Sequence, residues 1–221
     1  VIRPAIMTDE KLAKAPNVTK SKKMTGLPGY NFAMTISTLD CTGCGSCAQV
    51  CPGMKGNKAL IMKPIDDQLK YQEVFDYGRT LDIKPEVLEK FKSTTVKGSQ
   101  FKQPLLEFSG ACAGCGETPY AKLATQLFGD RMFIANATGC SSIWGGSAPA
   151  TPYTVNKEGR GPAWQNSLFE DNAEFGLGMA LGQNAMRTRL ASYVEEIYAK
   201  TSESETKEIC KKYLDTFTDS K

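Results

Sequence analysis

Four cysteines, Cys41, Cys44, Cys47 and Cys51, stand within an eleven-residue stretch of this chain, and Pro52 follows the last of them. The spacing Cys-x-x-Cys-x-x-Cys-x-x-x-Cys-Pro is that of the bacterial iron–sulfur run. The first three thiolates can turn onto one cubane cluster, because the glycines between them permit a tight loop. In two-cluster ferredoxins the fourth cysteine of such a run ligates the other cluster. The pattern therefore predicts four metal ligands and calls for a second run, which this chain lacks.

Two other uses of these four cysteines are a zinc site and a pair of disulfides. Zinc motifs pair two Cys-x-x-Cys units across a longer gap and lack the terminal Cys-Pro. Cysteines two residues apart rarely meet the geometry of a disulfide bridge. The spacing therefore favours an iron–sulfur cluster over both alternatives.

Three further cysteines, Cys112, Cys115 and Cys140, offer a second set of ligands. Their spacing alone does not separate an iron–sulfur cluster from zinc, and a thioredoxin-like Cys-x-x-Cys is a third, weaker option. The first motif favours iron and sulfur here too, because a chain that already carries clusters is a natural home for another. The remaining cysteine, Cys210, falls in a helical pattern over residues 205–217, where a lone cysteine is more often a small core residue than a ligand.

The elements around this second set predict where its cysteines lie. Residues 104–108 read as a strand, residues 117–129 as a helix and residues 131–136 as a second strand. Thr118 is the expected cap of this helix, with Pro119 in the first turn and a glycine as its stop. The apolar residues of the helix share one face: Tyr120, Leu123, Ala124, Leu127 and Phe128. Strand, helix and strand at this spacing predict a parallel crossover, which would bring the three cysteines to one edge of a sheet.

The first third of the chain reads as half of a ferredoxin-like domain. Residues 1–31 are expected to be mostly loop, residues 32–37 a strand that leads into the cluster loop, and residues 58–63 a short strand after it. Residues 65–102 are polar and read as a linker with helical pieces, one of them opened by Pro85. The predicted domains are therefore residues 1–64 and 103–221, joined by this linker.

Two segments follow the second set of cysteines. Residues 141–154 are rich in Gly, Ser and Pro and predict a loop without regular structure, which is either an ordinary surface loop or a ligand bed beside Cys140. Asp171 with a carboxylate three residues later predicts a cap that opens a long helix to about residue 199. The glycines in the first half of this helix permit close packing against a neighbour.

Composition excludes several functions. The chain has 221 residues, a net charge of +3 and no histidine. Rieske clusters, histidine-ligated haem, mixed Cys/His zinc sites and histidine acid–base chemistry within this chain are therefore excluded. The small net charge gives no footprint for nucleic acid, and no apolar run approaches membrane-spanning length. The basic group Lys20, Lys22 and Lys23 reads as a solvated surface, with docking of an acidic ferredoxin as the alternative.

Four stretches together resemble one family. They are residues 39–52, residues 104–120 with Cys112 and Cys115, residues 135–149 with Cys140, and residues 161–176. This combination closely resembles pyruvate:ferredoxin (flavodoxin) oxidoreductases, and the resemblance covers nearly the whole chain. It implies a ferredoxin-like α+β iron–sulfur half-domain followed by part of an α/β parallel-sheet domain that binds thiamine diphosphate.

The resemblance also implies an activity and its cofactors. Members of the family oxidatively decarboxylate pyruvate with coenzyme A, using thiamine diphosphate and Mg²⁺, and pass electrons through three [4Fe–4S] clusters to ferredoxin or flavodoxin. By resemblance, Cys112, Cys115 and Cys140 hold the cluster nearest the thiamine, and Glu117 and Cys140 contact that cofactor. Cys41, Cys44 and Cys47 match the ligands of one ferredoxin-domain cluster, and Cys51 belongs to the other.

The resemblance further implies that parts of the family lie outside these residues. The first ferredoxin run, the Gly-Asp-Gly signal for the magnesium diphosphate and the last cluster cysteine are all expected elsewhere, so this segment alone is not expected to be active. We expect a homodimer in the cytoplasm or in a hydrogenosome-type organelle, with no nucleic-acid or membrane partner. The alternative is a free-standing iron–sulfur electron-transfer protein or subunit without catalysis.

Overall fold

The computed structural model describes residues 1–53, 56–147 and 150–219. Its internal contacts divide the chain into two compact units: residues 1–133 with 139–164, and residues 134–138 with 165–221. The described elements of the first unit are, in order, β1 (Ile2–Thr8), α1 (Asp9–Ala13), β2 (Lys22–Lys23), β3 (Tyr30–Ile36), α2 (Ser46–Val50), η1 (Leu69–Tyr71), α3 (Gln72–Thr80), α4 (Pro85–Lys90), α5 (Val96–Ser99), α6 (Thr118–Phe128), η2 (Gly129–Arg131), α7 (Cys140–Ser142) and η3 (Ile143–Ser147).

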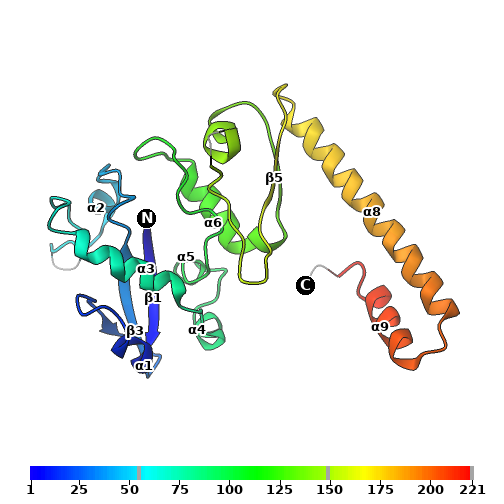
Figure 1. Cartoon of the computed structure of the whole chain (residues 1–221), viewed down its shortest axis with the longest axis horizontal. Coiled ribbons are helices and arrows are strands. Elements are labelled where there is room, and N and C mark those ends of the chain that lie inside the picture. The colour runs from blue at the N-terminus through cyan, green and yellow to red at the C-terminus, as the bar shows by residue number, and fades with distance from the viewer. Residues whose placement is uncertain (54–55, 148–149, 220–221) are drawn as a thin grey trace. The chain divides into compact units, whose positions relative to one another are not determined.

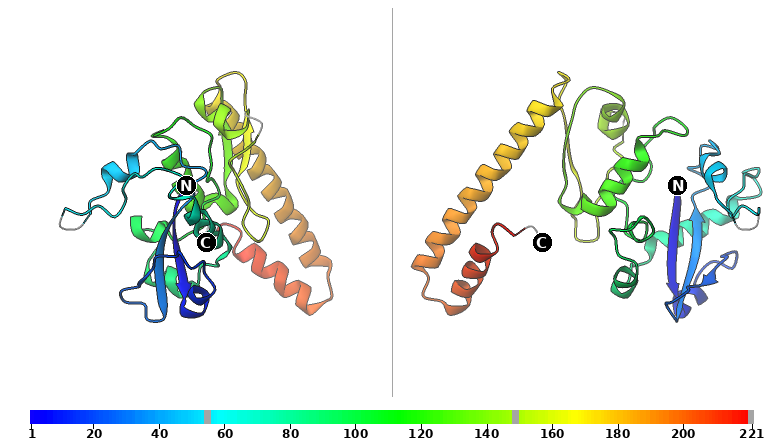
Figure 2. Two further views of the ribbon diagram at one scale, coloured as in Figure 1. Left: turned by 60° about the vertical axis from the view of Figure 1, so that its left-hand side comes forward. Right: turned by 180° about the vertical axis from the view of Figure 1, so that it is seen from behind.

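The first unit is organised around an antiparallel sheet of order β1-β3-β2. β1 and β3 pair along their whole length, from Ile2 opposite Ile36 to Thr8 opposite Tyr30, and they run side by side in both views of Figure 2. Helix α3 packs against both strands and passes across them in Figure 1. The buried core of this part is small: Ala5, Met7 and Ala33, flanked by Leu12, Ala15, Tyr77 and Leu81.

The strand predicted at residues 32–37 is confirmed as β3, but the loop predicted over residues 1–31 is wrong in part. Residues 2–8 form β1, although they include Pro4. Proline removes a donor from the ladder and is tolerated where a strand lies at the edge of a sheet. β1 is such an edge strand, with Pro4 opposite Met34, so the proline did not mark a loop.

The strand predicted at residues 58–63 is also wrong. This segment is irregular, and no described strand pairs with it. Its apolar side chains are open to solvent: Ile61 is 60% exposed and Met62 is 50% exposed. The Lys58 ammonium instead donates to the carbonyl groups of Ala48 and Gln49 in α2, at 2.7 and 3.1 Å. The segment therefore lacks the neighbouring backbone that a strand requires.

Residues 65–102 contain the helical pieces that were expected, and α4 begins at Pro85 as predicted. The proline suits the first turn of a helix, because its missing N–H has no partner there in any case. Val87 in α4 is fully buried. Gly98 in α5 lies so close to the Lys92 carbonyl that a Cβ would be 2.1 Å from its oxygen. The predicted domain boundaries around this segment stay predictions.

Helix α6 is confirmed over Thr118–Phe128, with Pro119 in its first turn. Its N-cap is Glu117 rather than the predicted Thr118, and no side chain caps the end. The predicted apolar face is buried only in part: Tyr120 is 77% exposed and Phe128 is 52% exposed, whereas Leu123, Ala124 and Leu127 are half-buried. Polar side chains also attach the helix. The Thr125 hydroxyl accepts from the Leu105 N–H at 3.1 Å, and the Gln126 amide donates to the Lys102 carbonyl at 3.0 Å.

The parallel crossover predicted from residues 104–108 to residues 131–136 is not formed. Residues 104–106 are buried, but their only described ladder contact is one antiparallel bridge between Leu106 and Tyr153. The second strand is present as β4 (Phe133–Asn136), and its partner is β5 (Ala163–Asn166). The Ala163 N–H donates to the Met132 carbonyl and the Ser167 N–H to the Asn136 carbonyl, both at 2.9 Å. Both contacts advance in the same direction along the chain, as in parallel pairing.

The segment predicted as an irregular loop over residues 141–154 is partly helical. Cys140–Ser142 form α7 and Ile143–Ser147 form the π-helical turn η3, while residues 148–149 lie outside the described residues. The glycines of this turn admit an aromatic ring: a Cβ on Gly146 would lie 2.5 Å from the Trp164 ring. The glycines therefore allow close packing of the Trp164 ring against this turn.

The second unit consists mainly of two helices. α8 spans Asn172–Lys200, close to the prediction, and α9 spans Ser204–Asp215. The two helices contact each other, and the Arg187 guanidinium donates to the Phe217 carbonyl at 2.8 Å. None of the α8 residues is buried. Asp171 stands at the expected cap position but makes no capping hydrogen bond. Among the described helices, none combines the length and the apolar character of a membrane span.

Candidate metal centres

The loop that carries Cys41, Cys44 and Cys47 is built on two glycines in the left-handed conformation. Gly43 has φ of 69° and Gly45 has φ of 76°, values that residues with a side chain seldom adopt. All three thiols are free; Cys41 and Cys44 are exposed, and Cys47 is half-buried. The loop therefore presents three thiols outside any disulfide, which are three of the four donors that a [4Fe–4S] cluster takes.

Cys51 follows α2 directly and is free and half-buried. The backbone N–H groups of Leu60, Gly53 and Ala59, in that order of importance, lower the pKa of its thiol. Hydrogen bonds to a thiolate favour the ionised form, which is the form that binds metals. Gly53 makes the turn possible, because a Cβ there would lie 2.4 Å from the Asn57 carbonyl oxygen.

The Cys112–Cys115 segment lies at the start of α6. A turn closes it, in which the Cys115 N–H donates to the Cys112 carbonyl at 3.0 Å. The backbone N–H groups of Thr118 and then Glu117 lower the pKa of the Cys115 thiol. The positive end of α6 is therefore directed at this sulfur, where it favours an anionic ligand such as a thiolate.

The two cysteine loops lie against each other within the first unit. The Ser46 side chain, followed by the Ser46 backbone N–H, has the largest effect in lowering the pKa of Cys44, and the Gly114 backbone N–H adds a smaller effect. A Cβ on Gly114 would lie 3.4 Å from the Ser46 hydroxyl and 3.8 Å from the Cys44 Cβ. The structure therefore brings together two loops that are about seventy residues apart in sequence.

Cys140 is exposed and begins α7. The chain that follows it returns to the neighbourhood of the second loop, because the Thr154 N–H donates to the Leu105 carbonyl at 3.0 Å. Burial, and after it the Glu117 carboxylate, raises the pKa of Tyr153. The segment after Cys140 and the exposed Glu117 are thus neighbours in the first unit.

The sulfur atoms themselves are not gathered. Within residues 1–53, 56–147 and 150–219, no three Cys, Asp or Glu side chains converge closely enough to hold a metal ion. The chemistry of the donors nonetheless fits iron–sulfur clusters, since seven of the eight cysteines are free and at least partly exposed. Cys210, the eighth, is buried in α9. The individual ligand assignments stay predictions.

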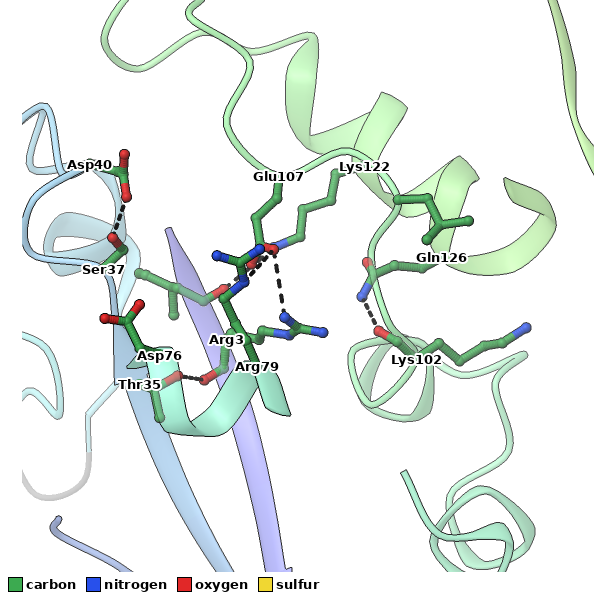
Figure 3. A network of polar contacts seen from close by, with 12 residues as sticks. Arg3, Thr35, Ser37, Asp40, Asp76, Arg79, Lys102, Glu107, Lys122 and Gln126 are labelled. Atoms are coloured by element: carbon green, nitrogen blue, oxygen red, sulfur yellow. Dashed lines mark hydrogen bonds and ion pairs between the residues drawn. The ribbon is translucent and has the colours of Figure 1, made fainter. Parts of the chain in front are cut away.

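Sequence reasoning missed a partly buried charge cluster formed by Arg3, Arg79, Glu107 and Lys122 (Figure 3). Its members come from four separate segments, so no motif or spacing marks them. The only available signal was the placement of Glu107 in an apolar run, a position at which a lone charge requires a partner.

Comparison with known proteins finds one matching domain family and several close relatives. The 4Fe-4S binding domain family matches residues 34–53. The chain is 58% identical over 194 residues to a pyruvate-flavodoxin oxidoreductase of Enterobacter agglomerans, which covers 88% of this chain and 16% of the relative. It is 54% identical over 216 residues to a pyruvate:ferredoxin oxidoreductase of Moorella thermoacetica, with 96% and 18% covered. It is 50% identical over 209 residues to a pyruvate dehydrogenase (NADP+) of Cryptosporidium parvum, with 92% and 10% covered.

The first match gives the class of protein: residues 34–53 are part of a 4Fe-4S binding domain. The chain belongs to the family of pyruvate-flavodoxin and pyruvate:ferredoxin oxidoreductases, which confirms the resemblance seen in its sequence. It spans less than a fifth of the length of these relatives.

Proposed function

We propose that this chain is the electron-relay part, with a portion of the thiamine-diphosphate site, of an enzyme that oxidatively decarboxylates pyruvate with coenzyme A. The products are acetyl-CoA, carbon dioxide, one proton and two electrons, and the electrons leave one at a time through three [4Fe–4S] clusters. The observation that carries the proposal is the contact at Gly114 between two loops of free cysteines. A relay needs its redox centres close together, and these loops meet in a chain related to pyruvate oxidoreductases.

In this proposal the second cysteine loop serves the cluster nearest the thiamine. Cys112, Cys115 and Cys140 are three of its ligands, and the fourth comes from a part of the longer protein outside these residues. The start of α6 supports the assignment, because its N–H groups favour the thiolate of Cys115. The return of the chain after Cys140 toward Leu105 supports it as well.

The first cysteine loop serves the clusters nearer the electron acceptor. Cys41, Cys44 and Cys47 ligate one cluster through the glycine loop, and Cys51 ligates another whose remaining cysteines lie elsewhere. The lowered pKa of Cys44 and that of Cys51 both favour the thiolate form that iron binds. Cys51 thus serves a different cluster from the other three cysteines of the run, as in two-cluster ferredoxins.

Glu117 and Cys140 are the proposed contacts to thiamine diphosphate. Bound there with Mg²⁺, the cofactor supplies the electron sink for decarboxylation. The exposed Glu117 carboxylate orients it by accepting a hydrogen bond, and Tyr153 lies beside this carboxylate. The chain contains no Gly-Asp-Gly sequence, so we assign the Mg²⁺ and the diphosphate to residues outside it.

The electron acceptor is ferredoxin or flavodoxin, the acceptors in the names of two relatives. A third relative at 50% identity is named for NADP+, which indicates that this segment does not select the acceptor. Lys20 and Lys22 are candidate contacts to an acidic carrier protein, whereas Lys23 is paired with Asp9 at 2.5 Å. Assembly as a homodimer and a cytoplasmic or hydrogenosome-type location complete the proposal.

A second candidate is a free-standing iron–sulfur electron-transfer protein or subunit, which the 4Fe-4S match over residues 34–53 favours. It shares the clusters but not the catalysis. The intact mass of the purified polypeptide under denaturing conditions separates the two: a mass several times 24.1 kDa supports the enzyme. A mass near that value, with redox-active iron, supports the relay alone.

Replacing one cysteine in the full polypeptide tests the enzymatic proposal. We expect Cys140→Ala to remove one cluster and to abolish the pyruvate- and CoA-dependent reduction of a viologen dye, while the ferredoxin-domain clusters remain. The matched control is Cys210→Ala, at the buried cysteine of α9, which leaves iron content and turnover unchanged. Unchanged turnover in Cys140→Ala would overturn the proposal.

A further inference from the structure

A partly buried ionic cluster joins four segments of the first unit (Figure 3). The Glu107 side chain is 9% exposed, and its Oε2 lies 3.6 Å from Arg3 Nη1 and 4.0 Å from Arg79 Nε. The Lys122 ammonium lies close to the same carboxylate and donates to the Ile2 carbonyl at 3.4 Å. The cluster therefore ties the start of β1, the end of α3, the segment before the second cysteine loop and helix α6 to one another.

The cluster includes residues on both sides of the second cysteine loop. Glu107 stands five residues before Cys112, and Lys122 lies in the second turn of α6, seven residues after Cys115. Both side chains reach the first residues of β1. The loop with Cys112, Cys115 and Glu117 is thus held at both ends on the same strand of the sheet.

The charges in the cluster do not balance. Three cations surround a single carboxylate, and the Glu107 Oε1 atom is buried without a hydrogen-bond partner among the described residues. Burying unequal charges costs free energy, so such a cluster is weak as a source of stability. Arg79 also lies over the Phe108 ring at 5.9 Å, next to Glu107. Because this cluster contributes little to stability, we expect its charges to have another role.

We propose that Glu107 and Lys122 are positioning residues that also tune the reduction potential of the redox centre held by Cys112, Cys115 and Cys140. The proposal rests on the proposed function, which supplies that centre. A cluster becomes more negative when it accepts an electron, so nearby fixed cations raise its reduction potential and nearby anions lower it. Partly buried charges are screened less by salt than exposed ones, so their influence persists at physiological ionic strength.

Opposite signs of charge give this inference a sharp test. In the full polypeptide, Lys122→Met removes a cation and is expected to lower the midpoint potential of the cluster at Cys112 and Cys115. Glu107→Gln removes the anion and is expected to raise it. An EPR-monitored redox titration measures the potential of each cluster separately. Structural loosening alone would move both variants in the same direction, or would broaden the spectrum of each without an ordered shift.

Three control variants separate the effect of charge from the effect of mutation itself. Lys122→Arg preserves the charge and is expected to return the potential to the wild-type value. Glu89→Gln and Lys92→Met change the same charges at exposed positions and are expected to move no cluster. If Glu107→Gln fails to fold, the outer variant Arg79→Met, whose side chain is 51% exposed, decides the matter with a smaller shift to lower potential.

Two different failures are distinguishable. If Cys115→Ala leaves the iron and sulfide content unchanged, no cluster is bound at this loop and the proposed function fails. If the cluster is lost in Cys115→Ala, yet the charge variants shift its potential in the same direction or not at all, the tuning role is overturned while the proposed function stands. An equal shift of all clusters would overturn it as well.

Discussion

The two candidate cysteine sites of this molecule are built in different ways. The first, Cys41 to Cys51, lies within eleven consecutive residues, and two left-handed glycines shape its loop. The second draws Cys112 and Cys115 from one segment and Cys140 from another that begins after α6 and β4. The first site therefore depends on local conformation, whereas the second depends on contacts between segments that are distant in sequence.

This difference explains why the two sites respond differently to sequence comparison. A short family model matches residues 34–53, because the four cysteines of the first candidate site lie within eleven consecutive residues there. The residues of the second candidate site fall within the longer match to a pyruvate:ferredoxin oxidoreductase. A local motif is enough to indicate one cluster. A set of ligands spread along the chain is recognised only when the sequence around all of them is compared.

The largest effect should come from deleting one ligand at each site in the full polypeptide. Cys115→Ala should reduce pyruvate-dependent reduction of both dye and flavodoxin by at least about 100-fold, or about 2.7 kcal/mol, because in the proposed function electrons enter at that cluster. Cys41→Ala should stop flavodoxin reduction but spare part of the dye reduction, because a dye accepts electrons from earlier clusters. Steady-state assays with both acceptors check this, and equal behaviour of the two variants would contradict the assigned order.

The next effect concerns the core of the first unit. Phe75 in α3 is 1% exposed, and its ring packs against Phe108, 6.1 Å away between centroids. Phe75→Ala should lower the free energy of unfolding by about 3–5 kcal/mol, because it leaves a cavity. Chemical denaturation measures the change. Leu181→Ala in α8 is the control, since Leu181 is 59% exposed, and a loss there as large as in Phe75→Ala would show that α8 is covered.

A smaller effect concerns the second site. Gly146→Ala should lower stability by about 1–3 kcal/mol, because the added Cβ overlaps the Trp164 ring. Gly182→Ala in α8 meets no atom within 4 Å and should instead raise stability by up to about 1 kcal/mol, through better helix propensity. Thermal unfolding of both variants tests the contrast, and a Gly146→Ala chain as stable as the wild type would refute the packing.

The smallest effect is a shift in thiol reactivity. A lowered pKa keeps a thiol ionised to lower pH, so alkylation of Cys44 in the metal-free chain should persist at pH values where an ordinary cysteine has become unreactive. Ser46→Ala removes the main hydrogen-bonding side chain and should move the pH profile of Cys44 upward. Mass spectrometry after iodoacetamide treatment resolves each cysteine. An unmoved profile would show that Ser46 does not act on this sulfur.

Sequence alone predicted several local features. The glycine loop around Cys44, β3, α4, α6 and α8 were found, because glycine spacing, first-turn prolines and helical periodicity act over a few residues. The capping hydrogen bonds predicted for Thr118 and Asp171 are not formed. The other errors were not local. β1 was missed because Pro4 is tolerated only at a sheet edge, and the predicted strands at residues 58–63 and 104–108 lack described strands to pair with.

The candidate sites divide in the same way. All eight cysteines were visible as residues, but the approach of Gly114 to Ser46 required the fold. The charge cluster around Glu107 was invisible, since Arg3 and Lys122 are distant from it in sequence and a charged residue alone carries no pattern. Predicting such contacts requires knowing which segments meet.

The measurement that tests the central claim most directly is low-temperature EPR of the full polypeptide after addition of pyruvate and coenzyme A. We predict that the wild type shows reduced [4Fe–4S] signals, and that Cys140→Ala shows its remaining clusters with dithionite but none with pyruvate. Signals that appear with pyruvate in both proteins would contradict the claim that electrons enter the relay at the site of Cys140.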